Sequence, residues 1–341
     1  MDEPNIFHLL TNWPIEPPST LTPLEGGTNN RTWLVQTAGA APYVLRLRSG
    51  TIDLPRIRYE AALLNTLRKK PLPFHLPHPL PASNGEHFVL VTQDHLTPLI
   101  ATLTPFLPGT IPERTAINIA KAGVALAQLD AALATIPATA LPTHSGSTRF
   151  LYGDLYHCHP LVPDPIATVA EILSPAQAQP LCAILRQTQQ DWEMLSLQNV
   201  PQQILHRDCG PGNVLMAEER VTAILDFEFA DTDRRLFDLC VAISWWPVRL
   251  MGTGQEWELI DAFGQAYTKL FPLTAEELRH LPSALRMRDT TSLIYRIGRY
   301  LAGLESKQTI QERVEHSLWR EAWLMAHHET LLSHALAWKM C

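Results

Sequence analysis

Short runs in which apolar and polar residues alternate predict strands in the first hundred residues. Residues 42–48 are the clearest case, because Leu45 and Leu47 alternate with Arg46 and Arg48. Successive side chains of a strand point to opposite faces, so we expect both arginines on one face and both leucines on the other. Four more strands are predicted, one on each side of a Gly/Asn-rich turn after Leu24 and two over 86–92 and 99–103.

Elsewhere the apolar residues recur every three or four positions, as they do on a helix. Residues 56–70 place Ala61, Leu64 and Leu67 on one side, with Glu60 near the start. Beyond residue 109 this pattern dominates, over 112–133, 175–195, 282–304 and 314–338. In the first of these helices the spacing assigns the following residues to the core: Ile117, Ala120, Val124, Ala127 and Ala131. The pattern predicts a strand-rich first part and a larger, helical second part.

Candidate chemistry gathers between residues 204 and 230. His206-Arg207-Asp208 is separated by four residues from Asn213, and Asp226 follows a second apolar run. This spacing is typical of the H-R-D-x-x-x-x-N loop of phosphoryl-transfer enzymes, with a metal-binding carboxylate downstream. Transfer needs one carboxylate to orient an acceptor hydroxyl and take its proton, and oxygen ligands for Mg²⁺. Asp208 suits the first role, and Asn213 with Asp226 the second.

The residues around this motif predict how it folds. Glycine and proline at 210–212 break any helix or strand after Asp208, so the chain can curl and bring its side chains to one site. Apolar runs at 214–216 and 221–225 indicate a hairpin that places Asn213 and Asp226 side by side. Taken singly, each residue also fits a structural role, such as a buried histidine, a turn or a cap. Their combination in this context favours the catalytic interpretation.

This stretch resembles the aminoglycoside phosphotransferase and choline kinase-like family, which includes type II homoserine kinases and shares the protein-kinase fold. In that family the third motif commonly lacks the glycine of Asp-Phe-Gly, which agrees with Glu228 after Asp226-Phe227. The resemblance extends over most of the chain and implies an α+β, bilobal, protein-kinase-like fold. The implied parts are an N-lobe over 1–103, with an antiparallel sheet and one αC-like helix, a hinge over 104–109, and a larger, mainly helical C-lobe over 110–341.

The resemblance also implies a nucleotide site in the N-lobe. Gly26, Gly27, Thr28 and Asn29 resemble the nucleotide-covering loop of the family. Glycine and asparagine tolerate a positive φ, so such a turn can bring backbone N–H groups near phosphates. The same residues suit an ordinary hairpin turn, and the sequence leaves both interpretations open.

Further residues are assigned to the nucleotide site by the resemblance. Arg46 lies where a lysine or arginine contacts the α- and β-phosphates, with Arg48 as the other choice. Glu60 is expected to pair with Arg46, as the αC glutamate does in the kinase fold. Thr104 and Phe106 fall in the segment that resembles the hinge, whose backbone is expected to pair with adenine. The alternatives are a solvent-facing side for the arginines and a solvated helix charge for Glu60.

In the C-lobe the resemblance supplies two supporting roles. Asp238 is expected at the start of a helix, where it accepts hydrogen bonds from the catalytic-loop backbone, and His206 is expected to support the same loop. Arg296 and Arg299 belong, with Asp289 and Ser292, to a polar stripe on a helix. Because a guanidinium group can form two parallel hydrogen bonds to a carboxylate, we expect at least one of these arginines to bind an anionic group of the acceptor. A stripe that simply faces water explains the same spacing.

Charge and composition exclude some classes of function. The 341 residues include 27 basic and 34 acidic ones, a net charge of −7, which argues against nucleic-acid binding. Five cysteines are scattered without a Cys-x-x-Cys pair, which favours a reduced, cytoplasmic protein. No stretch has the pattern of a signal peptide or a membrane span, so we expect no membrane partner.

These observations predict an enzyme that uses ATP and Mg²⁺ to phosphorylate a hydroxyl group of a small molecule. The acceptor stays open between a homoserine- or amino-alcohol-like metabolite, an aminoglycoside-type antibiotic and a sugar. A protein kinase is disfavoured, since the chain has no Ala-Pro-Glu motif and no long activation segment between Asp226 and Asp238. The alternative from another class is a nucleotide-binding pseudokinase that serves as a scaffold, against which the filled catalytic positions argue.

Overall fold

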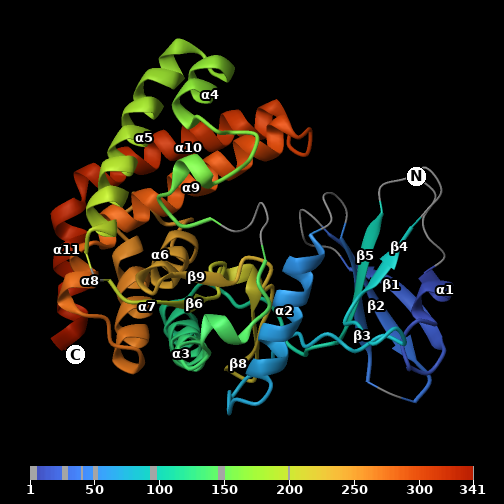
Figure 1. The fold of residues 1–341 in the computed structure, drawn as a ribbon. Coiled ribbons are helices and arrows are strands. Elements are labelled where there is room, and N and C mark those ends of the chain that lie inside the picture. The colour runs from blue at the N-terminus through green and yellow to red at the C-terminus, as the bar shows by residue number, and fades with distance from the viewer. Residues whose placement is uncertain are drawn as a thin grey trace.

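The computed structural model describes residues 6–24, 30–39, 41–48, 53–92, 98–144, 150–198 and 200–340. These residues form a sheet-rich part and a larger helical part. Figure 1 shows the two parts next to each other, with helix α2 (Leu54–Leu67) between the sheet and the rest of the molecule.

The N-terminal part is built on a five-stranded antiparallel sheet in the order β1-β2-β3-β5-β4. Its strands are β1 (Pro18–Leu24), β2 (Asn30–Thr37), β3 (Tyr43–Arg48), β4 (Val89–Val91) and β5 (Leu99–Pro105). A short helix, α1 (Ile6–Leu10), precedes them. The predicted alternation along β3 is confirmed, because Leu45 and Leu47 are buried and Arg46 and Arg48 take the other face.

Helix α2 has a defined start. The Asp53 carboxylate accepts the Arg56 N–H at 3.1 Å, and Pro55 lies in the first turn, where its missing N–H leaves no bond unmade. The three residues predicted to face the core are all buried: Ala61, Leu64 and Leu67.

The C-terminal part is mainly helical, as predicted. Its helices are α3 (Ala116–Leu133), α4 (Pro165–Ile172), α5 (Pro175–Ser196), α6 (Leu236–Trp245), α7 (Glu256–Leu270), α8 (Ala275–Arg279), α9 (Leu281–Leu301), α10 (Lys307–Ala326) and α11 (His328–Ala337). Two small antiparallel pairs lie among them, β6 (Gln202–Leu205) with β9 (Asp231–Arg234), and β7 (Val214–Ala217) with β8 (Arg220–Ile224). The second pair is the predicted hairpin. The division into lobes over 1–103 and 110–341 stays a prediction.

The predicted core face of α3 is wrong. Ile117 and Ala131 are exposed, and only Ala127 of the predicted residues is buried. The buried face instead carries Ile119, Ala122, Leu126 and Leu129. Gly123 explains why this face is buried. A Cβ there would come within 2.8 Å of the Phe263 carbonyl on α7, so α3 packs closely against α7 with the face that carries the glycine. By length and composition α3 is apolar enough to cross a membrane, and half of it is buried inside the structure.

The single helix predicted over 314–338 is also wrong, because the chain forms α10 and α11 there. They part at His327, whose φ of −117° and ψ of 13° leave the helical range. No glycine or proline marks this break in the sequence. The helices predicted over 175–195 and 282–304 are present as α5 and α9, with small shifts at their ends.

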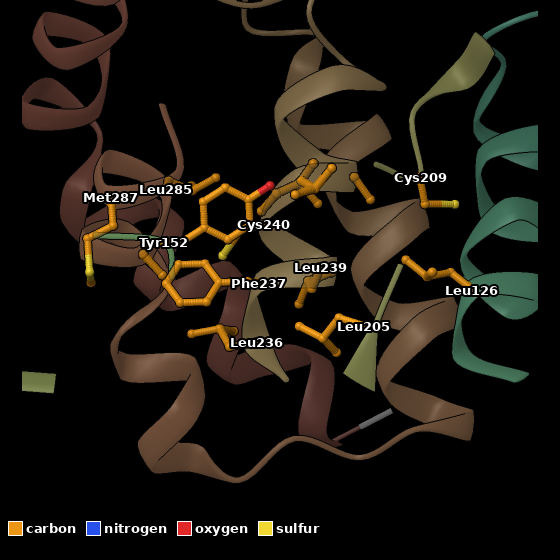
Figure 2. Close-up of a cluster of buried hydrophobic side chains, with 14 of the residues drawn as sticks. Leu126, Tyr152, Leu205, Cys209, Leu236, Phe237, Leu239, Cys240, Leu285 and Met287 are labelled. Carbon is orange, nitrogen blue, oxygen red and sulfur yellow. The ribbon is translucent and has the colours of Figure 1, made fainter. Parts of the chain in front are cut away.

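A hydrophobic core in the C-terminal part holds the catalytic segment. Figure 2 shows part of this core, which draws side chains from α3, α6 and α9: Leu126, Phe237, Leu239, Cys240, Leu285 and Met287. Cys209, which follows Asp208, is fully buried in the same core. The Cys209 carbonyl accepts the indole N–H of Trp246 at 3.3 Å. The loop that carries Asp208 therefore starts from a tightly packed base.

Candidate active site

The turn after β6 carries the first candidate residues. Asp238, in the first turn of α6, accepts the backbone N–H groups of His206 at 2.7 Å and Arg207 at 2.6 Å. Arg207 has a φ of 66°, which a residue with a side chain adopts only when its neighbours hold it there. The two hydrogen bonds to Asp238 hold the sharp turn that leads to Asp208.

His206 ties this turn to the end of β8. Its buried ring donates from Nε2 to the Leu225 carbonyl at 2.8 Å and accepts the Asp208 N–H at Nδ1, at 3.2 Å. A ring that donates at one nitrogen and accepts at the other is neutral. Burial lowers the pKa of His206, which favours the same neutral form. The structure thus places His206 as a support of the loop.

Asn213 lies directly against Asp208. Its Nδ2 donates to the Asp208 carbonyl and to the Asp208 Oδ2, both at 2.8 Å. Because the amide nitrogen is used in this way, the amide oxygen is the atom of Asn213 that is left for another ligand. Burial, with the nearby Asp226 and Glu228 carboxylates, raises the pKa of Asp208 to about 8. Several carboxyl groups therefore repel one another in a small region, as at a site that takes a cation.

The arginines of β3 have different partners. Arg48 forms a two-pronged ion pair with Glu60, with Nη1–Oε2 and Nη2–Oε1 distances of 2.8 Å. Arg46 instead donates to the Asp226 Oδ1 at 3.1 Å. The predicted pairing of Glu60 with Arg46 is therefore wrong, because Arg48, the last residue of β3, is the arginine that reaches Glu60 of α2. Burial alone would raise the pKa of Glu60, but Arg48, with Arg46 further away, lowers it.

A cavity of about 720 Å³ lies between the sheet and the catalytic loop. Six of the predicted site residues line it, together with Arg48, the alternative to Arg46: Arg46, Glu60, Thr104, Phe106, Asn213 and Asp226. Thr104 belongs to β5, and the Phe106 N–H donates to the Pro42 carbonyl at 2.9 Å. Because the Phe106 N–H is engaged by Pro42, Phe106 lines the cavity with atoms other than this backbone donor. The predicted residues Gly26, Gly27, Thr28 and Asn29 lie outside the described residues.

A second cavity, of about 220 Å³, opens on the other side of the catalytic loop. One wall carries the acidic residues Asp208, Asp226 and Glu228, and another carries Arg288, Ser292, Tyr295, Arg296 and Arg299 of α9. Asp226 lines both cavities. A molecule in either cavity therefore has access to the same carboxylate, as transfer of a group between two bound molecules requires.

Arg296 and Arg299 lie along the second cavity and converge on one carboxylate. They donate to the Glu305 Oε1 at 2.7 and 3.0 Å, and the Glu305 side chain is only 4% exposed. Ser292 lies on the same side of α9, whereas Asp289 is held by Arg320. The stripe predicted from the sequence is thus divided between the cavity and the interior.

Comparison with known proteins identifies the chain. Residues 20–281 match the phosphotransferase enzyme family. The chain belongs to this family. Its members transfer phosphoryl groups, and the chain is a phosphotransferase that acts on a hydroxyl group of a small molecule. This agrees with the resemblance carried by the catalytic motif.

Two kinds of relative are similar to this phosphotransferase. A homoserine kinase of Methylocella silvestris is 27% identical over 265 residues, which are 76% of this chain and 74% of the relative. A homoserine kinase of Xanthobacter autotrophicus is 26% identical over 289 residues, 83% of this chain and 82% of the relative. The structure of a microcompartment-associated aminopropanol kinase aligns with a TM-score of 0.72 at 19% identity, over 97% of this chain and 98% of that one. The predicted fold class is confirmed.

The site of this phosphotransferase also contains residues that the sequence did not single out. Arg56 of α2 is buried and donates from Nη2 to the carbonyls of Glu228 and Ala230, both at 2.7 Å. It thereby ties α2 to the segment after Asp226. Its partners are backbone carbonyls far along the chain, which no sequence pattern marks. Arg288 is a further example, since it lines the second cavity.

Proposed function

We propose that this phosphotransferase transfers the γ-phosphoryl group of ATP, with Mg²⁺, to the hydroxyl group of a small amino acid of the homoserine type. The observation that carries the proposal is the pair of cavities that meet at Asp226, with Asp208 and Asn213 between them. The larger cavity would take the nucleotide and the smaller one the acceptor.

The residues present fit a nucleotide and a metal ion. A volume of about 720 Å³ lies within the usual range for pockets that bind small molecules and cofactors. Burial and the nearby Asp226 and Glu228 carboxylates raise the pKa of Asp208, and a divalent cation would relieve the repulsion among these carboxylates. Asn213, through its amide oxygen, and Asp226 would hold Mg²⁺, which prefers oxygen ligands and supplies charge neutralisation on the phosphates.

The chain's own groups have separate tasks in this proposal. Asp208 orients the acceptor hydroxyl and takes its proton, while the Asn213 amide keeps the carboxylate in place. Arg46 faces the nucleotide cavity, where its guanidinium group suits phosphate oxygens. The Arg48–Glu60 pair joins β3 to α2 along the wall of the same cavity.

The acceptor cavity supports a small acceptor with an anionic group. Its volume of about 220 Å³ suits a molecule of amino-acid size. The wall formed by α9 carries Arg288, Arg296 and Arg299, which would repel a polycationic aminoglycoside and attract a carboxylate. The similarity to homoserine kinases supports the same class of acceptor.

Release of ADP in the presence of a panel of acceptors tests the proposal. We expect turnover with ATP, Mg²⁺ and L-homoserine, and little or none with a multi-ring aminoglycoside. Removal of Mg²⁺ with EDTA should abolish the reaction, and the Asp208→Asn variant serves as the inactive control. Turnover of the aminoglycoside at a higher kcat/KM than L-homoserine would contradict the proposed acceptor class.

A further inference from the structure

Arg288 of α9 lines the proposed acceptor cavity and stacks on a tryptophan. It lines the same cavity as Asp208, and its side chain is 11% exposed. The guanidinium carbon lies 5.0 Å from the centre of the Trp245 ring, which also lines the cavity. An arginine stacked on an aromatic face is held in one plane with its edge free to meet a ligand.

The hydrogen bonds of Arg288 leave donors unused. Nη1 donates to the Asp289 Oδ1 at 2.8 Å, whereas Nε is buried and, among the described residues, has no hydrogen-bond partner. Arg286, two residues earlier, is equally buried but binds both Asp191 and Glu321 and lies outside the cavity. A buried guanidinium donor without a partner costs free energy unless a ligand supplies an acceptor.

The carboxylate that pairs with Arg288 is shared with a second arginine. Asp289, its carboxylate partner, accepts a second hydrogen bond from the Arg320 Nε at 2.9 Å. One carboxylate is therefore shared by two guanidinium groups in the interior of the C-terminal part. The charge of an anionic acceptor would complete this cluster.

Arg288 is also set apart from the other arginines of the wall by its place on α9. Arg296 and Arg299 follow Arg288 by two and three turns of α9, about 12 and 16 Å along the axis. The hydroxyl and carboxylate of a homoserine-like molecule are separated by only three carbon atoms, a span much shorter than this spacing.

We propose that Arg288, stacked on Trp245, binds the carboxylate of the acceptor and so selects hydroxylated amino acids over amino alcohols. This inference rests on the proposed function and assigns a specificity-determining residue to it. Arg296 and Arg299, whose donors are engaged by Glu305, form the outer part of the wall. Arg288 and Asp208 then hold the two ends of one small acceptor.

The test compares two acceptors that differ only in the carboxylate, L-homoserine and 3-amino-1-propanol. The wild-type enzyme should prefer L-homoserine in kcat/KM. In Arg288→Gln the KM for L-homoserine should rise about 10- to 100-fold, as expected for a lost hydrogen-bonded charge contact. The constants for 3-amino-1-propanol and ATP should stay unchanged, so the preference disappears. Arg288→Lys keeps the positive charge but loses the bidentate hydrogen-bonding geometry, so its KM for L-homoserine should be intermediate.

Arg286→Lys is the matched control, because it changes an equally buried arginine of the same helix outside the cavity. It should lower the thermal midpoint and leave the preference between the acceptors intact. Arg288→Gln should still fold, since Asp289 keeps Arg320, and a circular dichroism melt checks this. Arg288→Lys provides the same comparison if the glutamine variant is unstable.

The outcomes separate the two proposals. A folded Arg288→Gln enzyme with the wild-type preference overturns the role of Arg288 and leaves the proposed function standing. Equal use of both acceptors by the wild type overturns the carboxylate contact alone. Turnover of neither acceptor overturns the proposed function, and the role of Arg288 with it.

Discussion

Asp208 and Asp226 are both carboxylates of one short segment, yet their partners differ. The Asn213 amide donates to Asp208, whereas the Arg46 guanidinium donates to Asp226. A carboxylate whose pKa is raised holds a proton more readily, which suits the group that takes the proton of a hydroxyl. Arg46 takes the Oδ1 of Asp226, and Asp226 lines both cavities, where a carboxylate oxygen is the kind of ligand that Mg²⁺ prefers.

Replacing Asp208 by asparagine should remove transfer and leave nucleotide binding nearly intact. The acceptor hydroxyl loses its proton acceptor, while Asn213 and Asp226 remain. We expect kcat to fall about 10²- to 10⁴-fold, the usual loss for a general base. Steady-state rates with L-homoserine and titration with a fluorescent ATP analogue measure the two effects. Wild-type turnover by a folded Asp208→Asn enzyme would rule out this role.

Replacing Asn213 by alanine should raise the Mg²⁺ concentration needed for half-maximal rate and lower kcat. The change removes an oxygen that fits a metal, and also the amide that holds the Asp208 carboxylate. Rates measured over a series of Mg²⁺ concentrations test this, with Asp226→Ala as a parallel variant. An unchanged Mg²⁺ dependence in both variants would place the metal on other residues.

At the scale of elements, periodicity predicts the faces of β3 and α2 because each buries one side. It does not predict which arginine of β3 meets Glu60, since that depends on how α2 lies relative to β3 in the folded protein. The face of α3 is mispredicted for a related reason. An alanine-rich helix is apolar almost all round, so its packing against α7 at Gly123, rather than its own period, selects the buried side.

A double-mutant cycle tests the observed pairing of α2 with β3. Arg48→Ala and Glu60→Ala should each raise the KM for ATP, and the double variant should be little worse than the worse single one. The coupling should be about 1 to 3 kcal/mol, as for residues in direct contact. The matched cycle of Arg46→Ala with Glu60→Ala should be additive within about 0.5 kcal/mol. Equal coupling in both cycles would show that Glu60 serves both arginines in the working enzyme.

At the scale of the whole molecule, long-range contacts between charged side chains and the backbone hold the site together. Arg56 joins α2 to the carbonyls of Glu228 and Ala230, and Asp238 joins α6 to the catalytic loop. The H-R-D-x-x-x-x-N spacing predicts the second contact through the family resemblance. The contact of Arg56 has no local signal in the sequence, because its acceptors are backbone atoms whose positions only the complete fold defines.

Glu277 links the far helices of the C-terminal part to the start of α6. Its carboxylate caps α8 through the Thr274 N–H and forms a two-pronged pair with Arg235, at 2.6 and 2.7 Å. Replacing Glu277 by glutamine should therefore lower the free energy of unfolding at neutral pH by about 1.5 to 3 kcal/mol. The neighbouring change Glu276→Gln, in an exposed pair with Arg279, should cost less than about 1 kcal/mol.

The pH dependence of this difference tests its electrostatic origin. Burial alone would raise the pKa of Glu277, but the hydrogen bonds and charge of Arg235 hold it below its usual value. A pKa that is lower in the folded state gives stability above the unfolded value of about 4.3, and that stability is lost as the pH falls through the folded pKa. The gap between wild type and Glu277→Gln should thus be constant near neutral pH and close in acid. Urea unfolding at about pH 7, 5 and 3.5 measures this difference in the free energy of unfolding. A difference that persists at the lowest pH would mean that the shape of the Glu277 side chain, rather than its charge, stabilises the protein.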